Sequence, residues 1–210
     1  MPSATIIDTL VLGPLDTNCY VIRDGEACWV VDPGPWPVEL LELLAGNELT
    51  PQKVLLTHGH GDHIAGVNDL KERFPKIRVA CPAGDADMLT DPRLNLSSNF
   101  GLPITVGPAD EGVHPGDLLT CGRSVWQVLD TSGHTPGGVS FYCEKSGVAI
   151  VGDALFAGSI GRCDLPGGDM ARLVANIRRS LLTLPPETRV LPGHGEETTV
   201  GIEKESNPYL

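Results

Sequence analysis

Residues 57–63, with the sequence Thr-His-Gly-His-Gly-Asp-His, restrict what this chain can fold into more than any other stretch. Four of its side chains bind metals well and fall within six positions: His58, His60, Asp62 and His63. The stretch follows an apolar run and precedes a helix-like run, which places it at the end of a strand. In an extended segment, side chains two positions apart point the same way, so His58 and His60 can bind one cation. The two glycines let the backbone turn, so that Asp62 and His63 can face a second cation.

Single residues of this stretch also have ordinary structural interpretations. Asp62 could cap the N-terminus of the following helix, and an isolated histidine is usually a hydrogen-bonded polar residue. The density of the cluster argues against both, because the chain has only six histidines and three of them fall within six positions. His114, in the sequence Val-His-Pro-Gly, fits no motif, and we interpret it as a surface or loop residue.

The stretch resembles the His-x-His-x-Asp-His signature of the metallo-β-lactamase superfamily. Residues 133–137 (Gly-His-Thr-Pro-Gly), 151–154 (Val-Gly-Asp-Ala) and 192–195 (Pro-Gly-His-Gly) resemble the remaining metal-binding motifs of that superfamily, in the same order. The resemblance implies the fold class α/β, with α+β character, in the form of a four-layer αββα sandwich.

The resemblance also implies a site for two divalent metal ions. One ion would be bound by His58, His60 and His134, the other by Asp62, His63 and His194, and Asp153 would bridge them. Imidazole and carboxylate ligands of this kind suit zinc first, with iron and manganese as alternatives.

Length and composition narrow the other expectations. The 210 residues fit one domain, 1–210, without the C-terminal helical domain that holds glutathione in full-length glyoxalase II. The net charge of −12 argues against a nucleic-acid partner, since such binding depends on Lys and Arg. No apolar run approaches the ~20 residues that span a bilayer, so we expect a soluble protein and no membrane partner. The six cysteines form no Cys-x-x-Cys pair and the first residues do not resemble a signal peptide, which favours reduced thiols in the cytoplasm.

Hydrophobic periodicity and turn residues predict the secondary structure. We expect helices at 38–44, 64–74 and 168–184, a short helical turn at 85–89, and a loop at 91–108 that helps to cover the substrate. We expect strands at 5–12, 18–23, 27–31, 54–57, 78–81, 124–130, 139–143, 148–151 and 189–191. The candidate metal ligands then lie just past the ends of strands, where loops commonly carry function.

Residues 156–169 resemble the substrate loop of glyoxalase II-like hydrolases. We predict substrate contacts from Ser159, Gly161 and Arg162, with Arg162 binding a carboxylate or pairing with Asp164 or Asp169. Cys163, where the family commonly has Thr, is interpreted as a packing residue rather than a nucleophile.

The resemblance therefore implies a metal-dependent hydrolase of the glyoxalase II-like type. Its substrate would be a small-molecule thioester such as a hydroxyacyl-glutathione, attacked by a metal-bridging hydroxide that Asp62 orients as the catalytic residue. One alternative is a mono-iron persulfide dioxygenase using His58, His134 and Asp153. Another is a metal-bound protein without turnover that acts by binding a partner. A homo-oligomer is compatible with all three.

Overall fold

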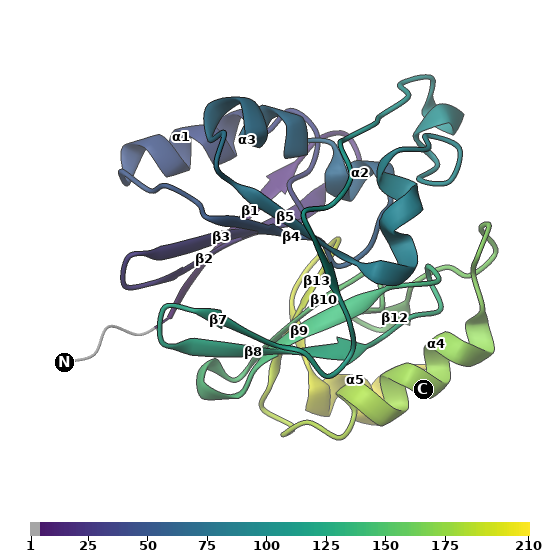
Figure 1. The fold of residues 1–210 in the computed structure, drawn as a ribbon. Coiled ribbons are helices and arrows are strands. Elements are labelled where there is room, and N and C mark those ends of the chain that lie inside the picture. The colour runs from purple at the N-terminus through teal and green to yellow at the C-terminus, as the bar shows by residue number, and fades with distance from the viewer. Residues whose placement is uncertain (1–4) are drawn as a thin grey trace.

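Two six-stranded sheets lie face to face, and helices cover the outer face of each (Figure 1). This is the architecture of the computed structural model, which describes residues 5–210 apart from the side chain of Phe100. The expected four-layer αββα sandwich is confirmed. No helix among the described residues is long and apolar enough to cross a bilayer.

The first sheet begins as an antiparallel meander and continues with parallel strands. Its strands pair in chain order: β1 (Ile6–Leu12), β2 (Thr17–Asp24), β3 (Ala27–Val31), β4 (Lys53–Leu55), β5 (Arg78–Pro82) and β6 (Glu111–Val113). Parallel neighbours need crossover connections. These contain α1 (Val38–Gly46), α2 (Gly61–Ile64), α3 (Val67–Arg73) and the 3₁₀ turns η1 (Ala83–Leu89) and η2 (Ser97–Phe100).

The second sheet has a similar plan, with an antiparallel meander followed by one parallel pair. Its order is β14 (Thr198–Thr199), β13 (Arg189–Pro192), β10 (Val148–Gly152), β9 (Val139–Cys143), β8 (Ser124–Asp130) and β7 (Leu118–Cys121). The turn η3 (Glu144–Ser146) joins β9 to β10, and a small hairpin of β11 (Leu155–Phe156) and β12 (Ser159–Ile160) follows β10. The helix α4 (Met170–Asn176) continues as the π-helical segment η4 (Ile177–Leu181), and α5 (Val200–Ser206) packs nearby.

Three apolar layers hold the four layers of secondary structure together. Side chains between the two sheets include Trp29, Trp126 and Phe141, all buried. A second layer lies between the first sheet and α1 and α3, and a third between the second sheet and α4, η4 and α5. Strands with both faces covered must be apolar throughout, which explains why β3 and β10 contain almost no polar residue.

The predicted strands all form, with small shifts at their ends, but β4 ends at Leu55 rather than at residue 57. The helix predicted at 64–74 forms over Val67–Arg73, but it begins three residues later than predicted and is separate from the turn before it. Two helices, α2 and α3, occupy this region, because the backbone N–H of Gly66 donates to the carbonyl of Pro33 at 2.8 Å and a side chain at Gly66 would collide with the carbonyl of Gly34. The helix predicted at 168–184 spans 170–181, and its last turns are π-helical rather than α-helical.

Several short elements carry too weak a pattern to be predicted. They are β6, β7, β14, the β11–β12 hairpin and α5. The loop expected at 91–108 is mostly irregular, with η2 inside it.

We predict that Gly66→Ala destabilises the protein, while Gly46→Ala at the end of α1 does not. A Cβ atom at Gly66 would lie 2.6 Å from the carbonyl oxygen of Gly34, whereas a Cβ atom at Gly46 meets nothing within 4 Å. Overpacking of this kind lowers the free energy of unfolding by roughly 1–3 kcal/mol, and an unhindered helical Gly→Ala raises it by roughly 0.4–1 kcal/mol. Urea denaturation of both variants measures the difference, and equal stability would contradict the packing described.

Candidate metal centre

The seven predicted metal ligands come from five segments, and the fold brings them to one edge of the two sheets. The chain leaving β4 carries His58 and His60, and α2 carries Asp62 and His63. The remaining ligands follow strands of the second sheet: His134 after β8, Asp153 after β10 and His194 after β13. The structure therefore brings all seven together between the ends of strands.

His58, His60 and His134 form the first cluster, and all three side chains are buried. Their ligand nitrogens lie within 4.8 Å of one another, and His134 Nε2 lies 2.9 Å from His60 Nδ1. Two nitrogens that bind one tetrahedral zinc at 2.0–2.1 Å lie roughly 3.3 Å apart. The spacing of His60 and His134 is therefore close to what one shared cation requires, and His58 lies near enough to join them.

Asp62, His63 and His194 form the second cluster. His194 Nε2 lies 3.3 Å from His63 Nε2 and 3.2 Å from Asp62 Oδ2, and His63 Nε2 lies 3.5 Å from the same carboxylate oxygen. Asp62 and His63 occupy the single turn of α2, and Asp62 does not cap it, because His60 stands at the N-cap position without a side-chain hydrogen bond. The cap interpretation of Asp62 is wrong.

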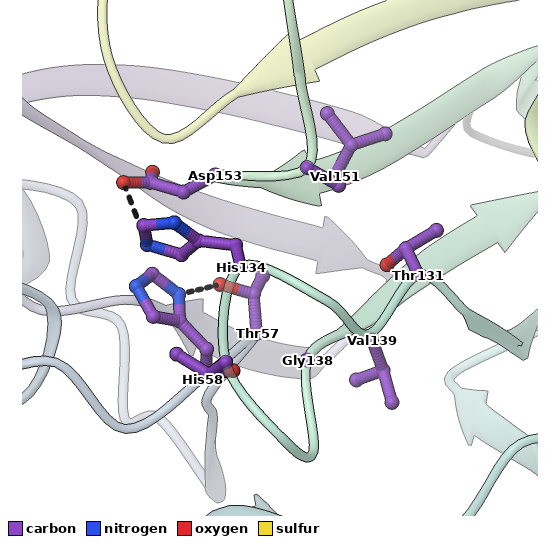
Figure 2. Close-up of a pocket in the computed structure, with 10 residues that line it drawn as sticks. Thr57, His58, Thr131, His134, Gly138, Val139, Val151 and Asp153 are labelled. Atoms are coloured by element: carbon purple, nitrogen blue, oxygen red, sulfur yellow. Dashed lines mark hydrogen bonds and ion pairs between the residues drawn. The ribbon is translucent and has the colours of Figure 1, made fainter. Parts of the chain in front are cut away.

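Asp153 lies between the two clusters. Its Oδ2 is 3.5 Å from His134 Nε2 and 3.5 Å from His194 Nε2, and its Oδ1 is 3.4 Å from His63 Nε2. Figure 2 shows the Asp153 carboxylate facing His134, with His58 beside that ring in the same pocket. One carboxylate in contact with both clusters has the position that a bridging ligand needs.

Buried polar atoms without partners test whether these residues suit cations. Among the described residues, His58 Nε2, His60 Nε2 and Asp153 Oδ1 are buried and make no hydrogen bond. Leaving such an atom unsatisfied costs roughly 1–3 kcal/mol, and more if it is charged. Cations bound at the two clusters would satisfy His58 Nε2 and Asp153 Oδ1, and the donor set of imidazoles and carboxylates suits zinc, iron or manganese.

Four of the five histidines are oriented through Nδ1, the ring nitrogen that faces away from the cluster. His134 Nδ1 donates to the carbonyl of Arg162 at 2.7 Å, and His194 Nδ1 donates to the carbonyl of Leu15 at 2.9 Å. The other two, His58 and His63, are oriented through a shared carboxylate described next. A partner on Nδ1 leaves the Nε2 lone pair for a cation, as in most metal sites.

Asp32 is the functional residue that the sequence did not reveal. Its Oδ2 accepts hydrogen bonds from the hydroxyl of Thr57 at 2.6 Å and from His63 Nδ1 at 3.0 Å. The same Thr57 hydroxyl lies 3.0 Å from His58 Nδ1, so one carboxylate orients a ligand of each cluster. Asp32 follows β3 with a left-handed backbone, φ 50°, and its sequence context of Asp-Pro-Gly indicated only the end of a strand.

The charges of the two clusters differ. Burial and the neighbouring histidines lower the pKa of His58, and burial and His134 lower the pKa of His60 to about 3, so both rings are neutral and offer lone pairs. Burial opposes protonation of His63, but the carboxylates Asp62, Asp153 and Asp32 raise its pKa well above the usual range. The second cluster thus has surplus negative charge, which a proton or a metal cation neutralises.

Of the three predicted substrate residues, Gly161 and Arg162 contact the ligand segments, and Ser159 lies in the neighbouring hairpin. Gly161 contacts the ligand segment directly, because a Cβ atom there would meet the backbone oxygen of Asp153. Arg162 holds His134 through its carbonyl, while its exposed guanidinium makes a two-bond ion pair with Asp164 at 2.8 and 2.7 Å. Ser159 lies in the β11–β12 hairpin and its hydroxyl donates to Ile160. Substrate binding by these three residues stays a prediction.

Cys163 and His114 take no part in either cluster. Burial raises the pKa of the Cys163 thiol, whose Sγ lies 3.5 Å from the carbonyl of Gly161. A protonated thiol is a poor nucleophile, in agreement with a packing role. His114 is exposed on the surface, 3.8 Å from Asp117.

The sequence of this chain is similar to a known family profile and to named proteins of other organisms. Residues 12–194 match the profile of the Metallo-beta-lactamase superfamily. The chain is 38% identical to the probable metallo-hydrolase YqgX of Bacillus subtilis over 95% of this chain and 94% of that protein. It is 34% identical to the hydroxyacylglutathione hydrolase GloC of Haemophilus influenzae, over 97% of each chain.

Two solved structures are similar over nearly their whole length. BLEG-1, a B3 metallo-beta-lactamase, superposes with a TM-score of 0.93 at 41% identity, covering 98% of this chain and 99% of that one. TTHA1623 in a di-iron-bound form superposes with a TM-score of 0.88 at 40% identity, covering 97% and 100%.

We predict that Asp153→Ala lowers the affinity for metal at both clusters, because this carboxylate lies between them and offsets the repulsion between two cations. Elemental analysis of the purified variant should fall from about two ions per chain to below one. His114→Ala is the control, and its metal content should equal that of the wild type. Two ions retained by Asp153→Ala, or the same loss in both variants, would contradict this assignment of ligands.

Proposed function

Because the chain belongs to the metallo-beta-lactamase superfamily and is a metallo-hydrolase, we propose that it hydrolyses thioesters of small hydroxy acids, such as a hydroxyacyl-glutathione. The observation that carries the proposal is the pair of three-residue clusters joined by Asp153, with a Gly-rich loop in direct contact with that residue. The relative named hydroxyacylglutathione hydrolase matches this chain over the length that holds both features.

Two divalent cations, zinc in the first place, would be held by the seven ligands and would lower the pKa of a water between them towards neutrality, which supplies a nucleophile for the carbonyl. A thiol has a pKa near 8.5, so the thiolate released from a thioester leaves without a proton donor. All ligands of both clusters come from this one chain.

Asp62 orients the nucleophile in this proposal. Its Oδ2 accepts a hydrogen bond from the hydroxyl of Thr17 at 3.2 Å and lies 3.2 Å from His194 Nε2. These contacts all use one carboxylate oxygen, and the pKa of Asp62 is lowered, chiefly by His63 and His194 acting against burial. An ionised Asp62 can therefore accept a hydrogen bond from a water through its other oxygen and so orient it.

The loop that carries Gly161 and Arg162 would hold the substrate. The Gly161 N–H donates to the carbonyl of Ala154 at 3.3 Å, which keeps the loop against the segment that carries Asp153. The Arg162 side chain, exposed and paired with Asp164, can exchange that exposed ion pair for a substrate carboxylate at little energetic cost. The backbone of Arg162 meanwhile stays bonded to His134.

The C-terminal segment braces the same loop. The Glu203 side chain on α5 is buried, and its Oε2 accepts hydrogen bonds from the N–H of Gly158 at 2.9 Å and from Asn207 Nδ2 at 2.7 Å. Asn207 Nδ2 also donates to the carbonyl of Ser159 at 3.0 Å. The turn of the β11–β12 hairpin is thus fastened to α5, which supports a fixed position for the loop that follows.

Two other activities must be tested beside thioester hydrolysis. A mono-iron persulfide dioxygenase would need only His58, His134 and Asp153, and the similar structure in a di-iron-bound form makes iron a metal to test in this chain. The similarity to a B3 metallo-beta-lactamase makes β-lactams a further class of substrate to test. A protein that carries both ions but turns over no ester, thioester, β-lactam or persulfide would be the metal-bound binding protein.

We predict that the protein, loaded with two zinc ions, hydrolyses a hydroxyacyl-glutathione with a higher kcat/KM than a β-lactam. Steady-state kinetics with both substrates, and oxygen uptake with a persulfide after iron loading, provide the test. Turnover of the persulfide alone, with one iron per chain, would contradict the proposal.

We predict that Arg162→Ala raises KM for substrates that bear a carboxylate, lowering kcat/KM by roughly 10- to 100-fold, the loss expected for a hydrogen bond to a charged group. Metal content should not change, because alanine keeps the carbonyl that holds His134. The matched control is Arg179→Ala, which removes another exposed arginine, paired with Asp130 at 3.0 Å. Loss of metal, or an equal effect in the control, would contradict a substrate role for Arg162.

We predict that Glu203→Ala lowers kcat/KM with unchanged metal content, while Glu203→Gln has nearly normal activity. Glutamine keeps an oxygen for Gly158 and Asn207 and places its amide against Thr198, whose hydroxyl can accept as well as donate. Kinetics and elemental analysis on both variants distinguish the brace from a metal-site effect. Equal losses from the two substitutions would show that the charge of Glu203, rather than its hydrogen bonds, matters.

A further inference from the structure

A buried carboxylate outside the ligand set, Asp85, contacts both segments that build the first cluster. Asp85 lies in η1, directly after β5 of the first sheet, and is 0% exposed. Its Oδ2 accepts hydrogen bonds from the N–H of Gly59 at 3.1 Å and from the hydroxyl of Thr135 at 2.6 Å. Its Oδ1 accepts from the N–H of Gly137 at 2.6 Å.

Two of the three donors adjoin histidine ligands in the chain, and the third, Gly137, lies in the same loop as His134. Gly59 separates His58 from His60 in the chain, and Thr135 directly follows His134. The first two histidines come from the loop after β4 of the first sheet, and His134 comes from the loop between β8 and β9 of the second. Asp85 thus links the two sheets at the point where they meet to form one three-histidine cluster.

The backbone around Asp85 is packed closely enough to make this link rigid. A Cβ atom at Gly84 would lie 2.8 Å from Gly137 Cα, and one at Gly137 would lie 2.6 Å from Asp85 N. Side chains at either position would push η1 and the His134 loop apart. The close approach lets one carboxylate reach both loops.

We propose that Asp85 is a positioning residue that assembles the cluster His58, His60 and His134 and thereby sets its affinity for a cation. The proposal rests on the two-metal part of the proposed function and is independent of the substrate. It follows that Asp85 acts on the first ion and leaves the second cluster, Asp62, His63 and His194, unaffected.

Asp85→Asn tests the proposal because an amide cannot replace this carboxylate. Gly59 and Gly137 both offer N–H donors, one to each oxygen of Asp85. An asparagine presents an acceptor to only one of them and an NH₂ group to the other, in either orientation. One of the two loops must therefore lose its attachment.

The measurement is a Zn²⁺ titration of the metal-free protein against a chromophoric chelator. In Asp85→Asn, the affinity for one ion should fall about 10- to 100-fold, as is typical when an outer partner of a metal ligand is lost, and the affinity for the other ion should not change. Asp24→Asn is the matched control, because Asp24 is also a buried carboxylate and is bonded to Arg123. Asp24 is the last residue of β2, about 23 Å along the strand from Thr17, which contacts Asp62. This control should bind both ions as the wild type does.

Combining Asp85→Asn with the loss of a ligand from one cluster identifies which ion is affected. In a His60→Ala protein, in which the first cluster is disabled, Asp85→Asn should not weaken the remaining ion further. In a His194→Ala protein, Asp85→Asn should still weaken the ion that is retained. The reverse pattern would assign Asp85 to the second cluster and overturn the proposal.

A second pair of variants keeps the test decisive if Asp85→Asn fails to fold. Thr135→Val removes one donor to Asp85, and Thr135→Ser keeps it. The valine variant should weaken the same ion by a smaller factor, and the serine variant should restore the wild-type affinity. Unchanged binding in Asp85→Asn and Thr135→Val, or equal weakening of both ions, would overturn the proposal while leaving the proposed function intact. A wild-type protein that binds fewer than two ions would overturn both.

Discussion

The structure depends on keeping two clusters of imidazoles and carboxylates together inside a protein interior. His58, His63 and His134 are almost fully buried, and Asp153 places a carboxylate between them. Ionised groups that leave water lose a large hydration free energy unless an opposite charge compensates for it. The ligand residues therefore need either protons or cations, and the rest of the fold holds them in place for either.

The sandwich meets this requirement by placing ligands at strand ends. Strands packed between apolar layers have little freedom, so the residues directly after them are held firmly even though they are irregular. Both sheets present such ends at the same edge, and each contributes ligands to each cluster. A site divided in this way exists only when the two sheets are packed against each other, which couples metal binding to the native fold.

Two further carboxylates make this arrangement specific. Asp32 orients one histidine of each cluster, and Asp85 attaches the loop of His58 and His60 to the loop of His134. Both are stabilised by hydrogen bonds from residues adjoining the ligands: Thr57 donates to Asp32, and Gly59 and Thr135 donate to Asp85. Hydrogen bonds to a buried carboxylate are stronger than those between neutral groups, and they position the rings within the narrow range that a metal site tolerates.

The sequence by itself predicted the longer strands of both sheets, and its resemblance to the superfamily implied the sandwich and the seven candidate ligands of the two clusters. The strands are predictable because burial on both faces requires continuous apolar runs. The ligands at 58–63 are predictable because three of only six histidines fall within six positions, whereas His134, Asp153 and His194 were implied by the family motifs around them. Only the tertiary structure decided which helix turn carries Asp62 and His63, because the break at Gly66 depends on the carbonyls of Pro33 and Gly34, about thirty residues away. It alone decided the roles of Asp32, Asp85 and Glu203 as well. Each of these carboxylates lies in an ordinary local sequence and gains its role from hydrogen bonds to residues that are distant in the chain or belong to the other sheet, contacts that no local pattern encodes.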